Sequence, residues 1–262
     1  MMRNSRLLAK IRSGQAARIA MMGHVLPPFI AFAAHEGYDA IWLDLEHRPM
    51  EQREVQMLLA FFHLYDIDCL IRPATREKAP LYRYLEDGAT GFVIPHVSTP
   101  EEVRDLVRKV KFPPVGDRGL NPSSLEANFG LDLGDSRQPM VDHALQETFL
   151  LVQVETPQAV ANLDAMAAVP GLDGFFVGPS DLALRMQHEP EAERISYEAT
   201  LEKLAAVCQQ YDRVWGTTCK DTAELRRQYA LGARLLWWGY DQAMLRDGLR
   251  QCRADLDAIL VE

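Results

Sequence analysis

Two acidic residues stand where consecutive apolar segments of this sequence end. Glu155 closes an apolar segment that begins at Phe149, and Asp181 follows a Gly-Pro-Ser turn after the next such segment. A carboxylate in an apolar setting is costly unless a cation compensates its charge. Mg²⁺ accepts two carboxylates with room for water, whereas an interior arginine paired with Glu155 is the alternative explanation. No His or Cys cluster accompanies the pair, which argues against a zinc hydrolase.

A histidine and an arginine follow two further apolar segments. His47 comes shortly after Asp44 and Glu46, whose carboxylates can tune an imidazole for proton transfer. Arg72 ends its segment with a planar guanidinium, which suits a developing oxyanion or an ion pair with Asp44 or Glu46. His96 follows another segment and is a weaker candidate. These residues predict acid–base chemistry beside a fixed positive charge.

The elements that must position these residues alternate between apolar strands and amphipathic helices. Helix-start signals, such as Thr99 followed by Pro100 and two acids, separate the apolar runs. Eight strands alternating with helices predict an α/β fold, a (β/α)8 TIM barrel forming one domain over residues 1–262. A doubly wound sheet is the alternative, but no G-x-G-x-x-G motif follows the first strand. The predicted strands are Arg18–Met22, Ala40–Asp44, Cys69–Arg72, Gly91–Pro95, Phe149–Glu155, Gly174–Gly178, Arg213–Thr217 and Arg234–Gly239.

The active site of such a barrel lies at the carboxyl ends of its strands, where the polar residues above are found. Along Phe149–Glu155 the side chains alternate between two faces, so that Gln153 and Glu155 share one face with Leu151. The other face is uniformly apolar and is expected to meet the helices. Gln153 and Glu155 are therefore predicted to point into the mouth of the barrel.

One stretch does not follow the strand–helix pattern. Residues 112–146 are rich in Pro, Gly, Asp and Ser, with no long periodic segment. Loops of this length are usually functional or mobile, and we expect this one to leave a strand at the carboxyl face of the barrel. Trp215, Trp237 and Trp238 lie in predicted strands, and we expect them to pack in the core.

The composition excludes several classes of protein. The chain has 262 residues, with 28 Lys and Arg against 37 Asp and Glu, a net charge of −9 that argues against nucleic-acid binding. Its four cysteines form no C-x-x-C pair, which is typical of free thiols in a reducing compartment. No apolar run approaches the roughly 18 residues of a membrane span. The sequence thus predicts a cytoplasmic protein with no membrane partner.

Five segments carry a family resemblance. They read YDAIWLDLEH at 38–47, GFVIPHV at 91–97, PPVGDRG at 113–119, VQVET at 152–156 and GLDGFFVGPSDL at 171–182. Together they resemble the HpcH/HpaI aldolases, metal-dependent 2-keto-acid aldolases related to the citrate lyase β-subunit. The resemblance extends from about Gly14 to beyond Asp241, nearly the whole chain.

The resemblance assigns roles to the candidate residues. It implies that Glu155 and Asp181 hold a divalent metal ion, Mg²⁺, Mn²⁺ or Co²⁺. It further implies that His47 accepts a proton and that Arg72 stabilises charge on the ketone oxygen of the substrate.

Other roles implied by the resemblance concern the substrate and a second subunit. Gln153, Ser180 and Asp181 match substrate contacts. Asp87 matches an acid that raises the basicity of the histidine across a subunit contact, which would explain its place at the opposite end of the barrel. The resemblance also implies a homohexamer, a trimer of dimers, in which a C-terminal helix at Gln242–Leu260 is exchanged between partners.

Two segments depart from the family pattern. Residues 120–125 read LNPSSL, where small and aromatic residues are usual, and residues 183–188 read ALRMQH, without the usual glycine. We expect both segments to shape the pocket for the second substrate. The departures leave the pyruvate end of the predicted site intact.

The resemblance implies a class II aldolase, a carbon–carbon lyase that reversibly cleaves a 4-hydroxy-2-oxo acid or a 2-keto-3-deoxy sugar acid. The products would be pyruvate and an aldehyde, formed through an enolate that the metal stabilises as a Lewis acid. The alternatives are a malyl- or citramalyl-CoA type lyase, an oxaloacetate decarboxylase on the same scaffold, and a non-catalytic 2-keto-acid-binding protein. No clear basic cluster for CoA phosphates stands in the sequence, and a binding protein needs no proton acceptor such as His47.

Overall fold

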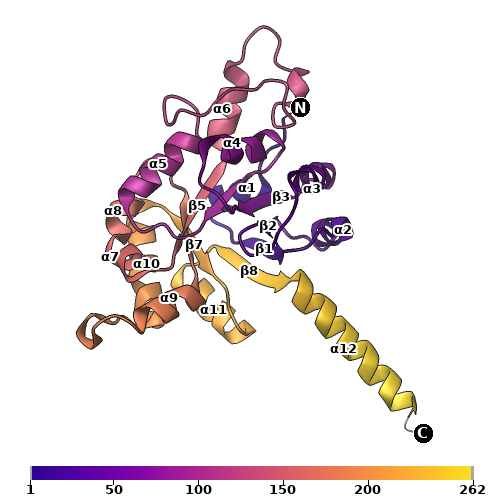
Figure 1. Cartoon of the computed structure of the whole chain (residues 1–262), viewed down its shortest axis with the longest axis vertical. Coiled ribbons are helices and arrows are strands. Elements are labelled where there is room, and N and C mark those ends of the chain that lie inside the picture. Colours follow the sequence, from indigo (N-terminus) through magenta and orange to yellow (C-terminus); the bar gives the residue numbers. More distant parts are fainter. Residues whose placement is uncertain (1, 261–262) are drawn as a thin grey trace.

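The expected strands close into a parallel barrel in chain order (Figure 1). The structure is a computed structural model that describes residues 2–260. Neighbouring strands pair in parallel all the way round, and β1 with β8 closes the barrel. The strands are β1 Ala17–Met22, β2 Ala40–Asp44, β3 Asp68–Arg72, β4 Gly91–Ile94, β5 Phe149–Val154, β6 Gly174–Val177, β7 Val214–Thr217 and β8 Leu235–Tyr240. The barrel prediction is confirmed, and each strand end lies within one residue of its predicted position.

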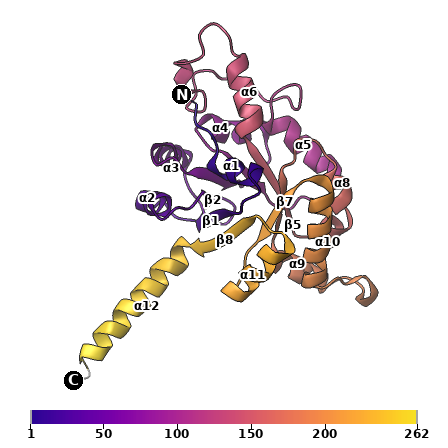
Figure 2. The same cartoon turned by 180° about the vertical axis from the view of Figure 1, so that it is seen from behind.

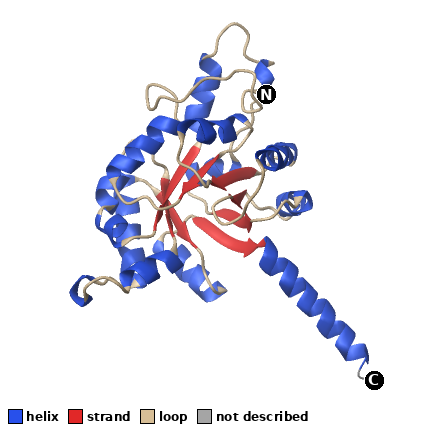
Figure 3. Cartoon of the chain, in the orientation of Figure 1, coloured by secondary structure: helices blue, strands red, loops and turns tan. Residues whose placement is uncertain are grey.

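Helices surround the strands (Figure 3). They are α1 Arg6–Arg12, α2 Pro27–His35, α3 Gln52–Leu64, α4 Lys78–Glu86, α5 Pro100–Val110, α6 Gln138–Glu147, α7 Pro157–Ala161, α8 Leu163–Ala167, α9 Pro179–Met186, α10 Tyr197–Tyr211, α11 Thr222–Leu231 and α12 Asp241–Leu260. Two short 3-10 turns, η1 Asn128–Gly130 and η2 Glu191–Glu193, lie in the connections. The N-terminal helix α1 packs Leu7 and Leu8 into the barrel interior.

The helix-start signals read from the sequence form real caps. The hydroxyl of Thr99 accepts a hydrogen bond from the backbone N–H of Glu102 at 3.2 Å, and the Glu102 carboxylate accepts one from the Thr99 N–H at 3.1 Å. This reciprocal pair satisfies two backbone donors that the first turn of α5 leaves free. Thr156 caps α7 with one such bond, since its hydroxyl accepts from the backbone N–H of Ala159 at 2.9 Å. The caps fix where each helix leaves its strand.

Side chains of the strands alternate between two apolar cores. Leu150, Val152 and Val154 of β5 belong to the core between strands and helices, whereas Leu151 lies in the barrel interior. The predicted orientation of β5 is thus confirmed. Three aromatic rings fill the interior edge to face: Trp42 lies 4.6 Å from Phe176 and 5.7 Å from Trp237 between ring centroids. These three rings fill the barrel interior below the carboxyl ends of the strands.

Two expectations about packing were wrong. The segment 112–146 is not a continuous loop, because it contains α6, whose short apolar spacing is hidden between Pro- and Gly-rich flanks. It follows a helix and leads into β5, so it lies at the amino ends of the strands rather than at the carboxyl face (Figure 1). Trp238 is 40% exposed and is no core residue, because the period of β8 turns it away from buried Trp237.

The last helix, α12, projects away from the barrel in both views (Figures 1 and 2). Asp241, its first residue, is the only buried residue among the described residues of this helix. Apolar side chains of the same helix, Leu245, Leu249, Leu256 and Leu260 among them, are exposed. In the described part of the chain, no helix is both long enough and apolar enough to cross a membrane.

Candidate active site

We call the carboxyl ends of the strands the C-terminal rim and their amino ends the N-terminal rim. On the C-terminal rim, Arg72 at the end of β3 binds Asp44 at the end of β2 through two hydrogen bonds of 2.9 and 2.7 Å. A third guanidinium nitrogen lies 3.2 Å from Glu46 Oε2. Burial alone would raise the pKa of Asp44, but the hydrogen bonds and charge of Arg72 lower it overall. Arg72 also lies over the Trp42 ring, 5.0 Å from its centroid, so the cation has a fixed position.

Glu155 follows β5 on the same rim, and its side chain is 3% exposed. Its Oε1 accepts a hydrogen bond from the amide of Gln153 at 2.6 Å, and its Oε2 accepts one from the backbone N–H of His96 at 3.0 Å. A Cβ atom at Gly178 would overlap this carboxylate, so the β6 end must carry glycine there. The predicted inward orientation of Gln153 and Glu155 is what the structure has.

The alternative explanation of Glu155, an ion pair with an interior arginine, does not hold in the described part of the chain. Arg72 pairs with Asp44 and Glu46 instead. The guanidinium of Arg185 donates to the backbone carbonyl of Glu155 at 2.8 Å, not to its carboxylate. The buried carboxylate therefore has no permanent cation among the ion pairs of residues 2–260.

Asp181 lies in the first turn of α9, which leaves β6 towards the rim. Its side chain is 41% exposed, and its carboxylate lies 3.7 Å from the guanidinium of Arg185 one turn later. Ser180, the other candidate on this turn, is exposed to solvent. Arg185 is not among the residues predicted from the sequence, although its spacing of four residues from Asp181 places both side chains on one helix face.

His96 lies nearer the centre of the candidate site than its weak sequence signal suggested. Its Nε2 lies 2.9 Å from Glu46 Oε1, and its Nδ1 lies 3.2 Å from Glu155 Oε2. The residue adopts a φ of 58°, a left-handed conformation that is unfavourable outside glycine. This backbone turn brings the imidazole between two carboxylates, one from β2 and one from β5, and so links the two halves of the rim.

His47 also reaches this rim, with 60% of its side chain exposed. Its ring Nε2 lies 3.6 Å from Glu46 Oε2, and its backbone N–H donates to the buried Asp44 at 3.3 Å. The turn after β2 is therefore anchored through its backbone, while the imidazole remains accessible to a substrate.

The surroundings of Glu155 fit a divalent cation. Burial raises the pKa of this carboxyl above its ordinary value of 4.5; Asp181 and Glu46 raise it further, and His96 opposes them. The Oε1 of Gln153 is buried and has no hydrogen-bond partner in the described structure. No group of three or more His, Cys, Asp or Glu side chains in residues 2–260 is arranged for a metal. Mg²⁺ nevertheless needs only one or two carboxylates when water and substrate oxygens complete its shell.

Asp87 lies elsewhere in the same chain. It follows α4 on the N-terminal rim, where it accepts a hydrogen bond from the amide of Gln56 at 2.7 Å. The divergent segment 120–125 lies beside it, since the N–H of Glu126 bonds to the carbonyl of Glu86. Within one chain, neither Asp87 nor this segment therefore lines the site at the C-terminal rim, contrary to what we expected of residues 120–125.

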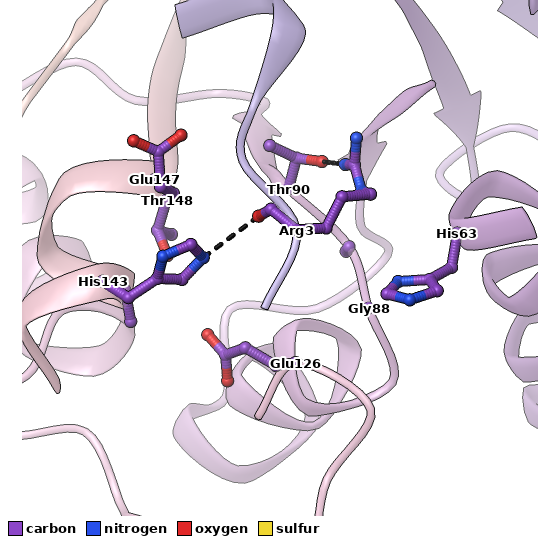
Figure 4. Close-up of a pocket in the computed structure, with 10 residues that line it drawn as sticks. Arg3, His63, Gly88, Thr90, Glu126, His143, Glu147 and Thr148 are labelled. Carbon is purple, nitrogen blue, oxygen red and sulfur yellow. Dashed lines mark hydrogen bonds between the residues drawn. The ribbon is translucent and has the colours of Figure 1, made fainter. Parts of the chain in front are cut away.

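A small cavity of about 40 Å³ also lies at the N-terminal rim (Figure 4). Its polar groups satisfy one another: Arg3 donates to Thr90 at 2.8 Å, and the Arg3 carbonyl lies 3.0 Å from Nε2 of His143. Arg3 also pairs with the fully buried Asp68. These contacts fasten the N-terminal segment across the bottom of the barrel and give the cavity a structural role.

Comparison with known proteins identifies the family. A family model for HpcH/HpaI aldolase/citrate lyase matches residues 25–248. A hydroxypyruvate/pyruvate aldolase of Pseudomonas aeruginosa is 32% identical over 247 residues, which cover 94% of this chain and 91% of that protein. A 2-keto-3-deoxy-L-rhamnonate aldolase of Salmonella schwarzengrund is 32% identical over 226 residues, 83% of this chain and 80% of that protein.

Similarity in three dimensions agrees. The crystal structure of an HpcH/HpaI aldolase from Desulfitobacterium hafniense DCB-2 superposes with a TM-score of 0.87 at 27% identity. The match covers 98% of this chain and 97% of that one. Family model, relatives and fold all agree with the resemblance carried by the five motifs, and the chain belongs to the HpcH/HpaI aldolase/citrate lyase family.

Proposed function

We propose that this chain is a class II pyruvate aldolase, which reversibly cleaves a 4-hydroxy-2-oxo acid or a 2-keto-3-deoxy sugar acid to pyruvate and an aldehyde. The observation that carries the proposal is the convergence of a fixed guanidinium, Arg72, and a buried carboxylate without a permanent cation, Glu155, on one rim. The names of the relatives, a hydroxypyruvate/pyruvate aldolase and a keto-deoxy acid aldolase, support the same substrate class.

Glu155 and Asp181 would hold a divalent ion, with Mg²⁺, Mn²⁺ and Co²⁺ as candidates. When bound, such an ion supplies Lewis-acid polarisation of the keto acid. Gln153 would hold Glu155 in place and offer its unpartnered Oε1 to a donor on the substrate or its water shell. The first turn of α9 offers free backbone N–H groups near Ser180 to the substrate carboxylate.

Arg72 would stabilise the negative charge that develops on the ketone oxygen during carbon–carbon cleavage. Its two bonds to Asp44 and its contact with the Trp42 ring fix the guanidinium before the substrate arrives. A preorganised cation costs no reorganisation when the charge appears, which is the main source of electrostatic catalysis.

His47 would accept the proton of the C4 hydroxyl group in the cleavage direction and return it in synthesis. Its exposure at the rim and its anchored backbone support this role. We assign to Asp87 of a partner subunit the support of this imidazole, because Asp87 of the same chain lies on the N-terminal rim.

A homohexamer with exchanged C-terminal helices would bring the C-terminal rim of one subunit, with His47, close to the N-terminal rim of another, with Asp87. Helix α12 exposes an apolar stripe, Leu245, Leu249, Leu256 and Leu260. A groove of about 380 Å³ lies between α2 and the start of α12. Phe32, which is 67% exposed, lines this groove. A second copy of α12 is the occupant we propose, since isolated exposed stripes of this length rarely remain uncovered.

The test is aldol formation from pyruvate and a panel of aldehydes with each candidate metal, read as product by mass. Cleavage of malyl-CoA and decarboxylation of oxaloacetate are measured beside it. Metal-dependent aldol formation at a rate above both side reactions supports the proposal. Activity on the CoA thioester alone would place the chain with the lyases on this scaffold, and binding of pyruvate without turnover would make it a sensor.

A further inference from the structure

A second cation stands on the C-terminal rim, outside the residues assigned above. Arg48 follows His47 in the turn after β2, and its Nε and Nη2 donate to the hydroxyl of Tyr240 at 3.1 and 2.8 Å. Nη2 also lies 3.3 Å from the side-chain oxygen of Gln242. Three contacts to neutral groups of β8 and α12 therefore fix the direction of this guanidinium.

Arg48 differs from Arg72 in the partners it keeps. Arg72 is neutralised by two carboxylates, whereas Arg48 makes no ion pair with any Asp or Glu of residues 2–260. Its Nη1 makes no hydrogen bond with residues 2–260. A guanidinium that is positioned by a phenol and an amide retains its charge and donors for an anion.

The neighbours of Arg48 place it at the mouth of the barrel. A Cβ atom at Gly23 would approach Arg48 Cγ to 2.9 Å and the Tyr240 hydroxyl to 3.1 Å, so the turn after β1 packs directly against it. The hydrogen bond with the Tyr240 hydroxyl raises the pKa of Arg48, and the charges of Asp44 and Asp241 raise it further. The guanidinium thus lies on the β1, β2 and β8 side of the rim, whereas Glu155 and Asp181 follow β5 and β6.

His24 stands on the same side. Its Nδ1 lies 3.0 Å from Oδ2 of Asp241, which is fully buried and also accepts the backbone N–H groups of Gly23 and His24. The Asp241 carboxylate holds the His24 ring on its Nδ1 side, and 48% of the His24 side chain is exposed. The exposed part of the ring lies beside the Gly23 turn, against which Arg48 packs.

We propose that Arg48, with His24 beside it, forms a subsite for an anionic group at the far end of the aldehyde substrate. This inference rests on the proposed function and narrows it to aldehydes that carry a carboxylate or a phosphate. In the proposed reaction pyruvate lies near β5 and β6 and His47 serves the C4 hydroxyl group, which comes from the aldehyde. Arg48 is the next residue along the chain after His47. The anion would bind Arg48 through the two N–H groups of Nη1, because those of Nε and Nη2 already bond to Tyr240 and Gln242.

The experiment compares aldehydes with and without a terminal anionic group. The pairs are 4-oxobutanoate with butanal, for a carboxylate, and glyceraldehyde 3-phosphate with glyceraldehyde, for a phosphate. The measured quantity is the ratio of kcat/KM for the charged aldehyde to kcat/KM for the neutral one, with pyruvate and metal saturating. A preference for the charged member in only one pair identifies which anion the subsite takes.

In the Arg48→Gln variant we expect this ratio to fall on the order of 10- to 100-fold, the usual worth of a charge-assisted hydrogen bond. Arg48→Lys should retain part of the preference for the charged aldehyde, because lysine keeps the positive charge but lacks the planar guanidinium. Tyr240→Phe should lower the ratio less than Arg48→Gln, because it removes only the anchor. The matched control is Lys220→Gln, which removes an exposed cation after β7 and should leave the ratio unchanged.

An unchanged ratio in Arg48→Gln would overturn the subsite, as would an equal loss in the Lys220→Gln control. Exchange of pyruvate methyl protons needs no aldehyde, so it is measured first in the unaltered protein. If that exchange is absent, the proposed aldolase function fails; if it is present and the ratio does not respond to Arg48, only the subsite fails.

Discussion

The guanidinium of Arg72 binds the carboxylate of Asp44 in a parallel, two-point arrangement, with Nε 2.9 Å from Oδ1 and Nη2 2.7 Å from Oδ2. Both side chains are almost fully buried. The register pairs Asp44 with Arg72 across β2 and β3, so the two strands bring them together without any loop. The cation beside the proposed reaction centre is therefore part of the barrel framework.

We predict that Arg72→Lys lowers kcat by roughly 100-fold or more, the usual effect of losing one preorganised donor to an oxyanion. Lysine keeps the charge but cannot form the fork to Asp44. Steady-state rates of pyruvate release, with unfolding curves to confirm the fold, measure the effect. A variant with unchanged kcat would remove Arg72 from the chemistry.

The same pair makes a prediction about stability. Arg72→Gln leaves Asp44 buried without its cation, which typically costs about 3 to 5 kcal/mol of unfolding free energy. Adding Asp44→Asn should restore most of that stability without restoring activity. Denaturant titration of the single and double variants tests it, and full recovery of turnover in the double variant would contradict the catalytic role of the cation.

Glu155 gives the protein a pH-dependent stability in the absence of metal. Its folded-state pKa is raised above 4.5, chiefly by burial, so its neutral form is favoured in the folded protein. The stability this contributes is present below that ordinary value and is lost as pH rises through the raised pKa. We predict that chelator-treated protein has a lower Tm at pH 7.5 than Glu155→Gln, and that Mg²⁺ raises the Tm only of the unaltered protein.

The matched control for that experiment is Glu147→Gln, which changes a carboxylate on the N-terminal rim that pairs with Arg12. It should retain the metal-dependent rise in Tm. An equal rise in Glu155→Gln would mean that the metal binds elsewhere.

The position of Asp87 makes a prediction about assembly. Since Asp87 and His47 lie on opposite rims of one chain, a site that uses both needs two subunits. Asp87→Asn and His47→Ala proteins should each be weakly active, and co-assembly of the two should regain activity in the mixed oligomer. Mixing two preparations of Asp87→Asn is the control. If mixed oligomers form without any gain, Asp87 does not act across a subunit contact.

Removal of the apolar part of α12 should change the oligomeric state. A chain ending at Arg246 keeps Asp241 and its bonds to the β1 turn, but loses Leu249, Leu256 and Leu260. We expect a smaller particle by light scattering. The double change Arg250→Gln and Arg253→Gln alters the charged side of the same helix and should leave the assembly intact. An unchanged mass after truncation would refute exchange of this helix.

Much of the fold was predictable because the barrel strands are buried on both faces. Their near-continuous apolarity separates them from the helices, and caps such as Thr99 mark where the helices begin. Helix α6 was missed because it is short and has few apolar positions between Pro- and Gly-rich flanks. Trp238 was misassigned because the alternation of β8 places it on the face opposite Trp237 but does not tell whether that face is covered by other side chains.

The candidate site was predictable where strand ends carry it. Gln153 and Glu155 were placed by the period of β5 alone, and Arg72 by its position at the end of β3. The central position of His96 could not be predicted, because it depends on a left-handed backbone conformation that no local sequence pattern indicates. The proposed role of Arg48 could not be predicted for a different reason. It depends on the absence of an acidic partner, which only the three-dimensional contacts of its guanidinium show.

The most direct test of the aldolase account is the exchange of pyruvate methyl protons with deuterated solvent, followed by proton NMR without any aldehyde. We predict that exchange requires an added divalent metal, stops with chelator, and falls roughly 100-fold or more in Glu155→Gln, since Lewis-acid stabilisation is worth several kcal/mol. Exchange that continues undiminished in the chelator-treated Glu155→Gln protein would contradict the assignment of this rim as a metal-dependent aldolase site.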